Sequence, residues 1–253
     1  MIDTHAHIYA DEFDDDIEVV ISRAKTAGIS HILMPAIDTE THEKMLLLEE
    51  SQPEYCISMM GLHPCSVKSN YKDELKVIEE YFSKRKFIAV GETGLDFYWD
   101  LTYKDQQYEA FHQQAEWAKH YDIPLVIHSR NSTNECIEVV QEHQDGKLKG
   151  VFHCFSGTAE QAKKIVDLGF YLGIGGVLTF KNSGLDKAIA DIDLSQLVLE
   201  TDAPYLAPVP YRGKRNECGY ITYVVGKLAE LKGIAASDID SVTSNNASKL
   251  FGL

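Results

Sequence analysis

Histidines stand at the ends of short apolar runs in this sequence, where they could bind a metal ion. The chain opens on His5-Ala6-His7, and because residues two apart on a strand point to the same side, both imidazoles can face one ion. Residues 124–128 and 150–153 are further apolar runs, and they end in His128 and His153. Any one of these histidines alone could equally be hydrogen-bonded in the core or cap a helix. The case for a metal site therefore depends on all of them lying at one end of the same fold.

Two carboxylates end runs of the same kind. Glu92 closes the run 87–92 on the face of Ile88 and Val90, at the mouth of an otherwise apolar interior, where a carboxylate needs a positive partner. A salt bridge would satisfy that need, and so would a bridge between two metal ions. Asp202 closes the last such run, where it could also be the N-cap of the next segment. Four histidines and two carboxylates at the ends of five runs favour a metal centre over six unrelated roles.

Strands and helices in alternation must position these residues. Short apolar runs rich in β-branched residues alternate with helical patterns, which is typical of βαβ units and a parallel sheet. The predicted strands span 1–7, 30–36, 55–62, 87–92, 124–128, 150–155, 171–175 and 196–202. We therefore predict an α/β fold, a closed (β/α)8 TIM barrel with its catalytic groups at the C-terminal ends of the strands. An open doubly wound sheet is the alternative, but neither a Gly-x-Gly-x-x-Gly motif nor a phosphate-loop lysine motif is present.

A covering helix is expected after each strand. Apolar stripes at helical spacing occur within 17–24 and 75–82. The same pattern predicts helices over 106–120, 133–143, 159–168 and 220–232, and a closing helix over 237–251 with Ser237 as its N-cap. Residues 203–219 hold three of the seven prolines and form a long loop at the end of the barrel where sites are built.

The overall composition fits one soluble globular domain. With 253 residues, 44% hydrophobic and 25% charged, the chain is long enough for one large core, and a single domain over residues 1–253 is expected. No basic stretch followed by an apolar run begins the chain, and no apolar segment reaches the roughly 18 residues of a membrane span. We therefore expect a cytoplasmic protein without membrane contact. Five cysteines without a Cys-x-x-Cys pair fit reduced thiols, and a monomer is compatible with the sequence.

Six motifs occur in order along the chain, namely DTHAH, GLHP, GETGLD, IHSR, HCFSG and ETDAPYLAP. With these motifs the sequence resembles the TatD family of metal-dependent hydrolases from Asp3 to Phe251. The resemblance implies a TIM barrel of the amidohydrolase kind with two metal ions. It implies that one ion is held by His5, His7 and Asp202, the other by His128 and His153, and that Glu92 bridges them. The chain departs from the family pattern at Cys218, where proline is usual, and at Asn131-Ser132, where an acidic residue and alanine are usual.

The function expected from this pattern is hydrolysis of an ester bond. Two neighbouring cations can lower the pKa of a bridging water and stabilise the attacking and leaving oxygens of an in-line displacement. That chemistry suits a phosphodiesterase, and we expect a deoxyribonuclease that acts as an exonuclease on single-stranded DNA ends with a two-metal-activated water. Asp202 would orient the water and serve as general acid/base besides binding metal, and Glu92 would be the bridge.

Two divalent ions are the expected cofactors, and the candidates are Zn, Mn, Mg, Fe and Ni. Imidazole ligands favour Zn, Mn, Fe or Ni, whereas the family's nucleases are described as magnesium-dependent. The same centre could act on carbon, as a hydrolase of amides, lactones or carboxylic esters, including an aminoacyl-tRNA deacylase. A non-enzymatic metal-binding or scaffold protein is a third alternative, and it is disfavoured because every expected ligand position is filled.

Basic side chains are few, so contacts with DNA or another phosphodiester should be local. The formal charge of −15 argues against a broad duplex-binding surface. The candidate substrate-binding residues are His63, Arg130, Lys181, Arg212 and Arg215. His63 could instead be a structural cap, and the basic stretch 212–215 could be a solvated loop. Residues 97–99, a Phe-Tyr-Trp sequence, could stack on a base or belong to a core aromatic cluster.

Overall fold

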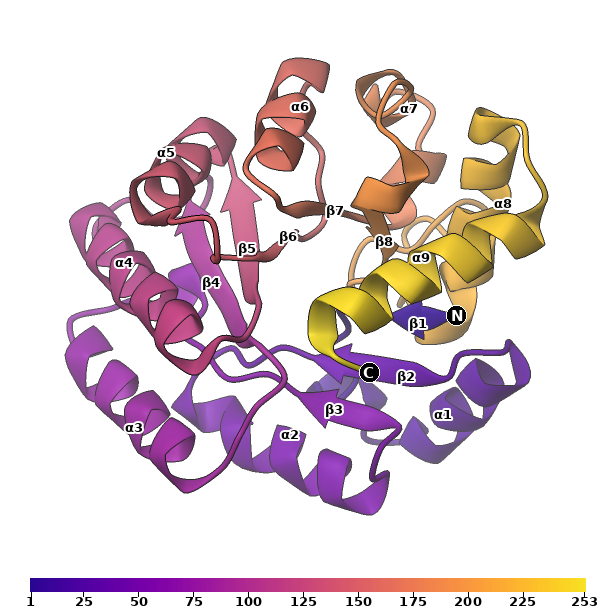
Figure 1. The fold of residues 1–253 in the computed structure, drawn as a ribbon. Coiled ribbons are helices and arrows are strands. Elements are labelled where there is room, and N and C mark those ends of the chain that lie inside the picture. The colour runs from indigo at the N-terminus through magenta and orange to yellow at the C-terminus, as the bar shows by residue number, and fades with distance from the viewer.

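Eight short parallel strands form a ring around the middle of the molecule, and the computed structural model describes all residues from 1 to 253 (Figure 1). The strands are β1 (Ile2–Asp3), β2 (His31–Met34), β3 (Cys56–Ser58), β4 (Val90–Asp96), β5 (Leu125–Arg130), β6 (Gly150–Phe152), β7 (Tyr171–Ile174) and β8 (Leu197–Leu199). They pair in the orders β1-β2-β3 and β4-β5-β6-β7-β8. A bridge between Met60 and Val90 joins β3 to β4, and the Thr4 amide donates to the Leu199 carbonyl over 3.0 Å, which joins β8 to β1. The ring is closed, and the predicted (β/α)8 barrel is confirmed.

All eight predicted strands are present, with different ends. Most are shorter than the apolar runs that predicted them, because the chain leaves the sheet pairing before each run ends. β4 and β5 instead continue past Glu92 and His128, because their pairing extends to the partners Asp96 and Arg130. The residues at the C-terminal ends therefore stand partly on strands and partly on the loops that follow.

Helices surround the ring of strands (Figure 1). They are α1 (Ile17–Thr26), α2 (Thr39–Ser51), α3 (Tyr71–Lys84), α4 (Lys104–Tyr121), α5 (Thr133–His143), α6 (Ala159–Asp167), α7 (Leu185–Ala188), α8 (Ile221–Lys232) and α9 (Ala236–Phe251). The five helices predicted with both ends are confirmed, and α5 has the predicted ends. None of the helices is long and apolar enough to cross a membrane. All five cysteines are free thiols, as expected.

Two details of the helix predictions were wrong. β7 has no full covering helix, because α7 is a single turn of four residues and the chain before it forms the 3-10 helix Gly176–Thr179, which contacts α8. The N-cap of α9 is Ala235 and not Ser237. The carbonyl of Ala235 accepts the amides of Asp238 and Ile239, so Ser237 lies inside the first turn.

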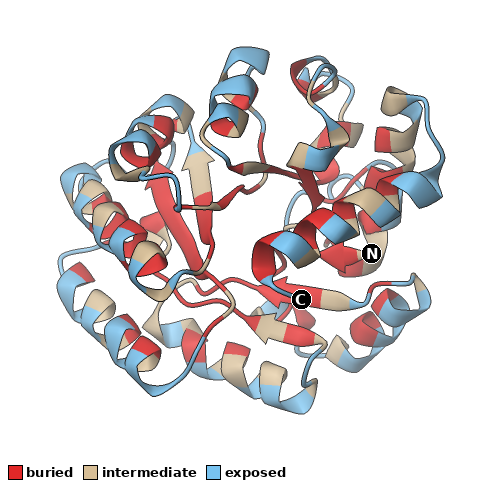
Figure 2. Cartoon of the chain, viewed as in Figure 1, coloured by how far each residue is buried: buried red, intermediate tan, exposed pale blue.

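Alternation along the strands divides the apolar residues into two layers. On β5, Ile127 packs in the outer layer between strands and helices, whereas Val126 packs in the inner layer. The inner layer consists of Ile2, Leu33, Met59, Ala89, Val126, Val151, Val198, Ala247, Leu250 and Phe251. The last three belong to α9, which lies across the ring in Figure 1, and Figure 2 shows the buried strands inside helices whose outer faces are exposed. α9 therefore closes the end where the strands begin, and the opposite end is left for a site.

Glu92 reaches the barrel mouth from a face that differs from the prediction. Val90 packs in the outer layer and Ala89 in the inner layer, so regular alternation would turn Glu92 outward with Val90. The pairing register of β4 on β5 shifts between Val90 and Thr93, and a bulge of this kind changes the face that the next side chains take. The predicted placement of Glu92 on the face of Val90 was therefore wrong, although the carboxylate does lie at the mouth.

Gly94 allows β4 to lie close to β5 beyond this shift. Its φ is +130°, and a Cβ at this position would lie 2.1 Å from the carbonyl oxygen of His128. We predict that Gly94→Ala destabilises the protein by about 3 kcal/mol or more, which is a fall in Tm of roughly 10 °C for a chain of this size. Thermal unfolding by circular dichroism measures the change.

Gly146→Ala is the matched control for this substitution. Gly146 also has a positive φ, +87°, but a Cβ there would meet nothing within 4 Å. Gly146→Ala should therefore lower the free energy of unfolding by only about 1 kcal/mol, the cost of the positive φ for alanine. Equal losses in the two variants would show that close approach of β4 to His128 is unimportant for stability.

Candidate metal centre

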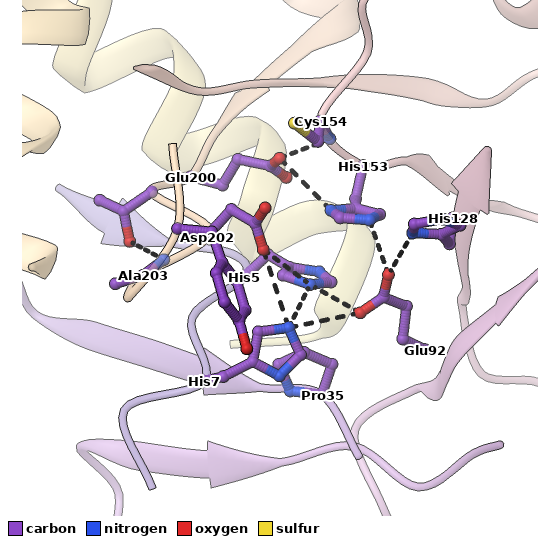
Figure 3. A network of polar contacts seen from close by, with 12 residues as sticks. His5, His7, Pro35, Glu92, His128, His153, Cys154, Glu200, Asp202 and Ala203 are labelled. Atoms are coloured by element: carbon purple, nitrogen blue, oxygen red, sulfur yellow. Dashed lines mark hydrogen bonds and ion pairs between the residues drawn. The ribbon is translucent and has the colours of Figure 1, made fainter. Parts of the chain in front are cut away.

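The carboxylate of Glu92 lies at the centre of a cluster of imidazoles at the C-terminal ends of the strands (Figure 3). Its Oε2 atom is 3.0 Å from Nε2 of His5 and 3.4 Å from Nε2 of His7. The two Nε2 atoms are 3.3 Å apart, and Oδ1 of Asp202 lies 3.8 and 3.7 Å from them. Ala6, between the two histidines, packs in the outer layer, which explains why both imidazoles point inward as alternation predicts.

These four ligand atoms have the spacing of a metal site. A cation that binds nitrogen and oxygen atoms tetrahedrally at roughly 2.0–2.1 Å places them about 3.4 Å from one another. The separations among His5, His7 and Glu92, and those from Asp202 to the two histidines, run from 3.0 Å to 3.8 Å, on both sides of that value. One cation would therefore fit among His5, His7 and Glu92, with Asp202 beside both histidines.

The second oxygen of Glu92 faces a different group of imidazoles. Oε1 lies 2.9 Å from Nδ1 of His128, 2.8 Å from Nε2 of His153 and 3.3 Å from Nε2 of His63. His128 and His153 each follow an inward-facing valine by two residues, so strand alternation brings both to the interior. Glu92 thus presents one oxygen to His5 and His7 and the other to His63, His128 and His153.

The charges in the cluster also fit a cation site. Burial would raise the pKa of Glu92, but the imidazoles of His153, His63 and His5 outweigh it and hold that pKa well below its ordinary value. Burial lowers the pKa of His5, whereas Glu92 overcomes the effect of burial and raises the pKa of His153. A buried, ionised carboxylate among imidazoles needs positive charge nearby, and divalent cations supply it by displacing protons.

Two polar groups outside the cluster orient its histidines. Nδ1 of His7 lies 3.1 Å from the hydroxyl of Tyr9, which donates its own proton to the carbonyl of Pro35 over 2.6 Å. The hydroxyl therefore accepts from Nδ1–H, and Nε2 of His7 keeps a lone pair for a metal. In the same way, Oδ2 of Asp96 lies 2.8 Å from Nε2 of His128 and leaves Nδ1 of that ring facing the cluster.

Sequence reasoning missed three buried carboxylates beside the centre, Asp3, Asp96 and Glu200. Asp3 accepts the amide and hydroxyl of Thr201 over 3.0 and 2.6 Å and so ties β1 to the segment after β8, and burial raises its pKa to about 7. Glu200 lies 3.6 Å from Nδ1 of His153. All three stand in motifs that carry the family resemblance, and that membership was the only signal for them in the sequence.

The predicted substrate-binding residues have different surroundings. His63 lies in the cluster itself, and its Nδ1 accepts the amide of Cys65, so it has the capping contact as well. Arg130 ends β5, and Lys181 and Arg212 lie on the segments that follow β7 and β8. All three are exposed, and their charges are not paired with a carboxylate. These residues remain candidates for contact with a substrate phosphate.

Arg215 has a structural partner. Its guanidinium donates to both carboxylate oxygens of Asp16 over 2.8 and 2.7 Å, and also to the carbonyl of Glu12. This ion pair holds the loop 203–219 against the beginning of α1. The role of Arg215 in phosphate binding stays a prediction, and its present contacts favour a role in fixing the loop.

A (β/α)8 barrel with such a cluster at the C-terminal ends of its strands defines a metal-dependent hydrolase, and comparison with known proteins agrees. Residues 2–252 match the family described as TatD related DNase. The chain is 37% identical over 252 residues to the metal-dependent hydrolase YabD of Bacillus subtilis, covering 99% of this chain and 98% of that protein. The crystal structure of YjjV, a TatD homolog from Escherichia coli K12, has a TM-score of 0.94 and 33% identity, covering 100% of this chain and 98% of that one. This chain belongs to the TatD family of metal-dependent hydrolases.

A further relative carries a more specific name. The chain is 29% identical over 259 residues to a protein of Pectobacterium parmentieri named 3'-5' ssDNA/RNA exonuclease TatD, and the match covers 100% of both chains. The match to this protein therefore extends over all of the barrel.

Proposed function

We propose that this hydrolase is a phosphodiesterase that acts as an exonuclease on the ends of single-stranded DNA and uses two divalent cations. The observation that carries the proposal is the position of Glu92, whose two carboxylate oxygens face two separate groups of imidazoles. The relative named as a single-strand exonuclease supports the same substrate class. The whole chain, 1–253, would act as one domain, since its strands form one closed ring.

The proposed ligands divide between the two oxygens of Glu92. His5, His7 and Asp202 would hold one cation and His128 and His153 the other, with Glu92 between them. The cations would polarise an attacking water and neutralise the charge that develops on the phosphoryl oxygens. His63, at the edge of the second group, would donate to a phosphate oxygen of the substrate.

Asp202 is the proposed general acid/base. Its Oδ1 faces His5 and His7, while Oδ2 has no hydrogen bond within the chain and is free to accept a proton from water. Burial raises the pKa of Asp202 to about 7, against the opposing effect of His153. A bound cation would lower this pKa, so the proposed role rests on the position of the carboxylate, which could take a proton from the attacking water and return it to the leaving oxygen.

Binding of a DNA end would rest on few cations. Arg130, Lys181 and Arg212 are the exposed basic groups at this end of the barrel that we propose to meet phosphates. Three neutralised phosphates on a single strand give a log–log salt slope of about −2, or a loss of roughly twenty-fold in affinity between 50 and 200 mM salt. Such a short contact suits a strand end and not a long duplex.

The test is digestion of linear single-stranded, linear duplex and covalently closed circular DNA by metal-loaded protein, with a salt series. We expect preference for single-stranded ends, a slope near −2 and complete loss of activity with a chelator. Arg212→Ala should weaken binding and reduce the slope by about 0.7. Efficient cutting of closed circles, or a slope steeper than about −5, would rule out the end-binding proposal.

Metal content tests the two-cation assignment separately. His128→Ala and His153→Ala should each lower the stoichiometry from about two toward one ion per chain, because each removes a ligand of the second group. Elemental analysis of protein purified without a chelator measures both stoichiometry and the identity of the ions. His112→Ala is the control, since His112 pairs with His143 on the outer helices, away from the cluster. Two full equivalents in both site variants would remove these histidines from the ligand set.

Hydrolysis at carbon is the second candidate function. The same cluster could act on an amide, a lactone, a carboxylic ester or an aminoacyl-tRNA, because a polarised water attacks carbon as well as phosphorus. Comparing bis(4-nitrophenyl) phosphate with 4-nitrophenyl carboxylic esters separates the two. Turnover of the carboxylic esters alone would favour the carbon substrate and overturn the nuclease proposal.

A further inference from the structure

Two aromatic side chains are exposed just after the end of β4, next to the metal centre. Tyr98 is 52% exposed and Trp99 is 68% exposed, whereas the only other tryptophan, Trp117, is 6% exposed. Their rings meet edge to face, with centroids 4.8 Å apart. Phe97 differs from them, because it packs against the core beside Tyr108. The aromatic sequence thus divides into one core residue and two exposed rings.

A guanidinium group completes this exposed surface. β5 lies beside β4 (Figure 1), and its last residue, Arg130, places Cζ 4.0 Å from the centre of the Tyr98 ring and 5.4 Å from that of Trp99. Arg130 has no carboxylate partner, so its charge stays available to a ligand. The two exposed rings and a cation that lies over the Tyr98 ring without a carboxylate partner form a small surface that suits a flat, electron-rich ring attached to a phosphate.

Asp96 joins this surface to the metal centre. Its Oδ1 accepts the amides of Tyr98 and Trp99 over 2.9 and 3.1 Å, while its Oδ2 lies 2.8 Å from Nε2 of His128. The amide of Phe97 donates to the carbonyl of Arg130 over 2.9 Å. The backbone that carries the exposed rings is therefore anchored, one carboxylate away from a proposed metal ligand.

We propose that Tyr98, Trp99 and Arg130 form a stacking platform for an unpaired nucleobase of the strand being cut. The inference rests on the proposed nuclease function and adds to it a reason for single-strand preference: a base can stack here only when it is not paired. Base stacking on aromatic rings tolerates any sequence, because every base has a π-face. The platform would therefore select single strands without selecting a base.

The test compares two oligonucleotides that differ only in the three nucleotides at each end, which carry either normal bases or tetrahydrofuran abasic sugars. Wild-type enzyme loaded with metal should prefer the base-bearing strand in kcat/KM by about ten-fold to a hundred-fold, the range that loss of base stacking gives. The double variant Tyr98→Ala with Trp99→Ala should bring that ratio close to one. The conservative double variant Tyr98→Phe with Trp99→Phe should keep most of it.

Leu101→Ala is the control for general disturbance of the loop, because Leu101 is 56% exposed in the same segment but has no aromatic ring. It should leave the ratio at the wild-type value. A ratio that stays at the wild-type value in the double alanine variant, or falls equally in Leu101→Ala, would overturn the platform.

Fluorescence of Trp99 gives a second readout that does not need cleavage. The base-bearing strand should quench the emission of the metal-loaded enzyme more than the abasic strand does, and Trp99→Phe, which leaves the buried Trp117, should abolish the difference. If the enzyme cleaves neither strand, the nuclease function is refuted. If both strands quench the fluorescence equally, only the platform is refuted.

Discussion

Glu92→Gln is expected to lower kcat for a phosphodiester by about 10³-fold while leaving the fold intact. The carboxylate stands between two imidazole groups, with Oε2 3.0 Å from His5 and Oε1 2.8 Å from His153. Glutamine keeps the size of the side chain but removes the negative charge that would balance two cations, and its amide nitrogen cannot bind a metal. Initial rates with bis(4-nitrophenyl) phosphate, together with metal content by elemental analysis, measure the effect.

Glu142→Gln is the matched control, because it makes the same change at an exposed position on α5. It should show wild-type turnover and metal content. Near-ultraviolet circular dichroism of the Glu92 variant should match the wild type, which excludes unfolding as the cause. Wild-type turnover by Glu92→Gln, with two bound ions, would remove Glu92 from the bridging position.

Asp202→Asn should also have a large effect, and the size of the effect should depend on the leaving group. If Asp202 returns a proton to the leaving oxygen, cleavage of an oligonucleotide should slow by about 10²- to 10⁴-fold, because a sugar alkoxide leaves poorly without a proton. Hydrolysis of bis(4-nitrophenyl) phosphate should slow much less, because 4-nitrophenolate leaves without needing a proton. The ratio of kcat values for the two substrates measures the acid role apart from any loss of metal.

Metal content decides how the Asp202 result is interpreted. Oδ1 of Asp202 lies 3.8 Å from Nε2 of His5 and 3.7 Å from Nε2 of His7, so asparagine should also weaken the first metal group. Assays at saturating metal remove that contribution. Asp191→Asn is the control, because it makes the same change at an exposed position before β8. It should alter kcat for neither substrate. Equal losses on both substrates at saturating metal would leave Asp202 as a ligand without an acid role.

The positions of the strands and of the inward-facing histidines followed from the sequence. The predicted runs at β5 and β6 end in His128 and His153, and in the structure each histidine follows an inward-facing valine by two residues. The pair His5 and His7 follows the same rule, and their Nε2 atoms lie 3.3 Å apart. These predictions succeeded because side-chain direction along a strand is a local property with a period of two.

The direction of Glu92 and the ends of two helices depended on contacts between distant segments, which no local sequence pattern shows. Glu92 faces the interior because the register of β4 on β5 shifts between Val90 and Thr93, and a bulge is created by the neighbouring strand as much as by the strand itself. The single turn of α7 and the capping of α9 by Ala235 likewise depend on the packing of the chain around them.

The supporting carboxylates show the limit of the sequence most clearly. Asp3 binds Thr201 across 198 positions of the chain, and Asp96 binds His128 across 32. The sequence around a carboxylate does not show which residue it will bind. Closure of the barrel brings the first and last strands together and so determines that partner. The residue types and the strand period thus determined which groups could form the metal centre. Only the closed ring decided which imidazoles each oxygen of Glu92 faces and which carboxylates hold those imidazoles in place. These contacts join strands that are distant in the chain.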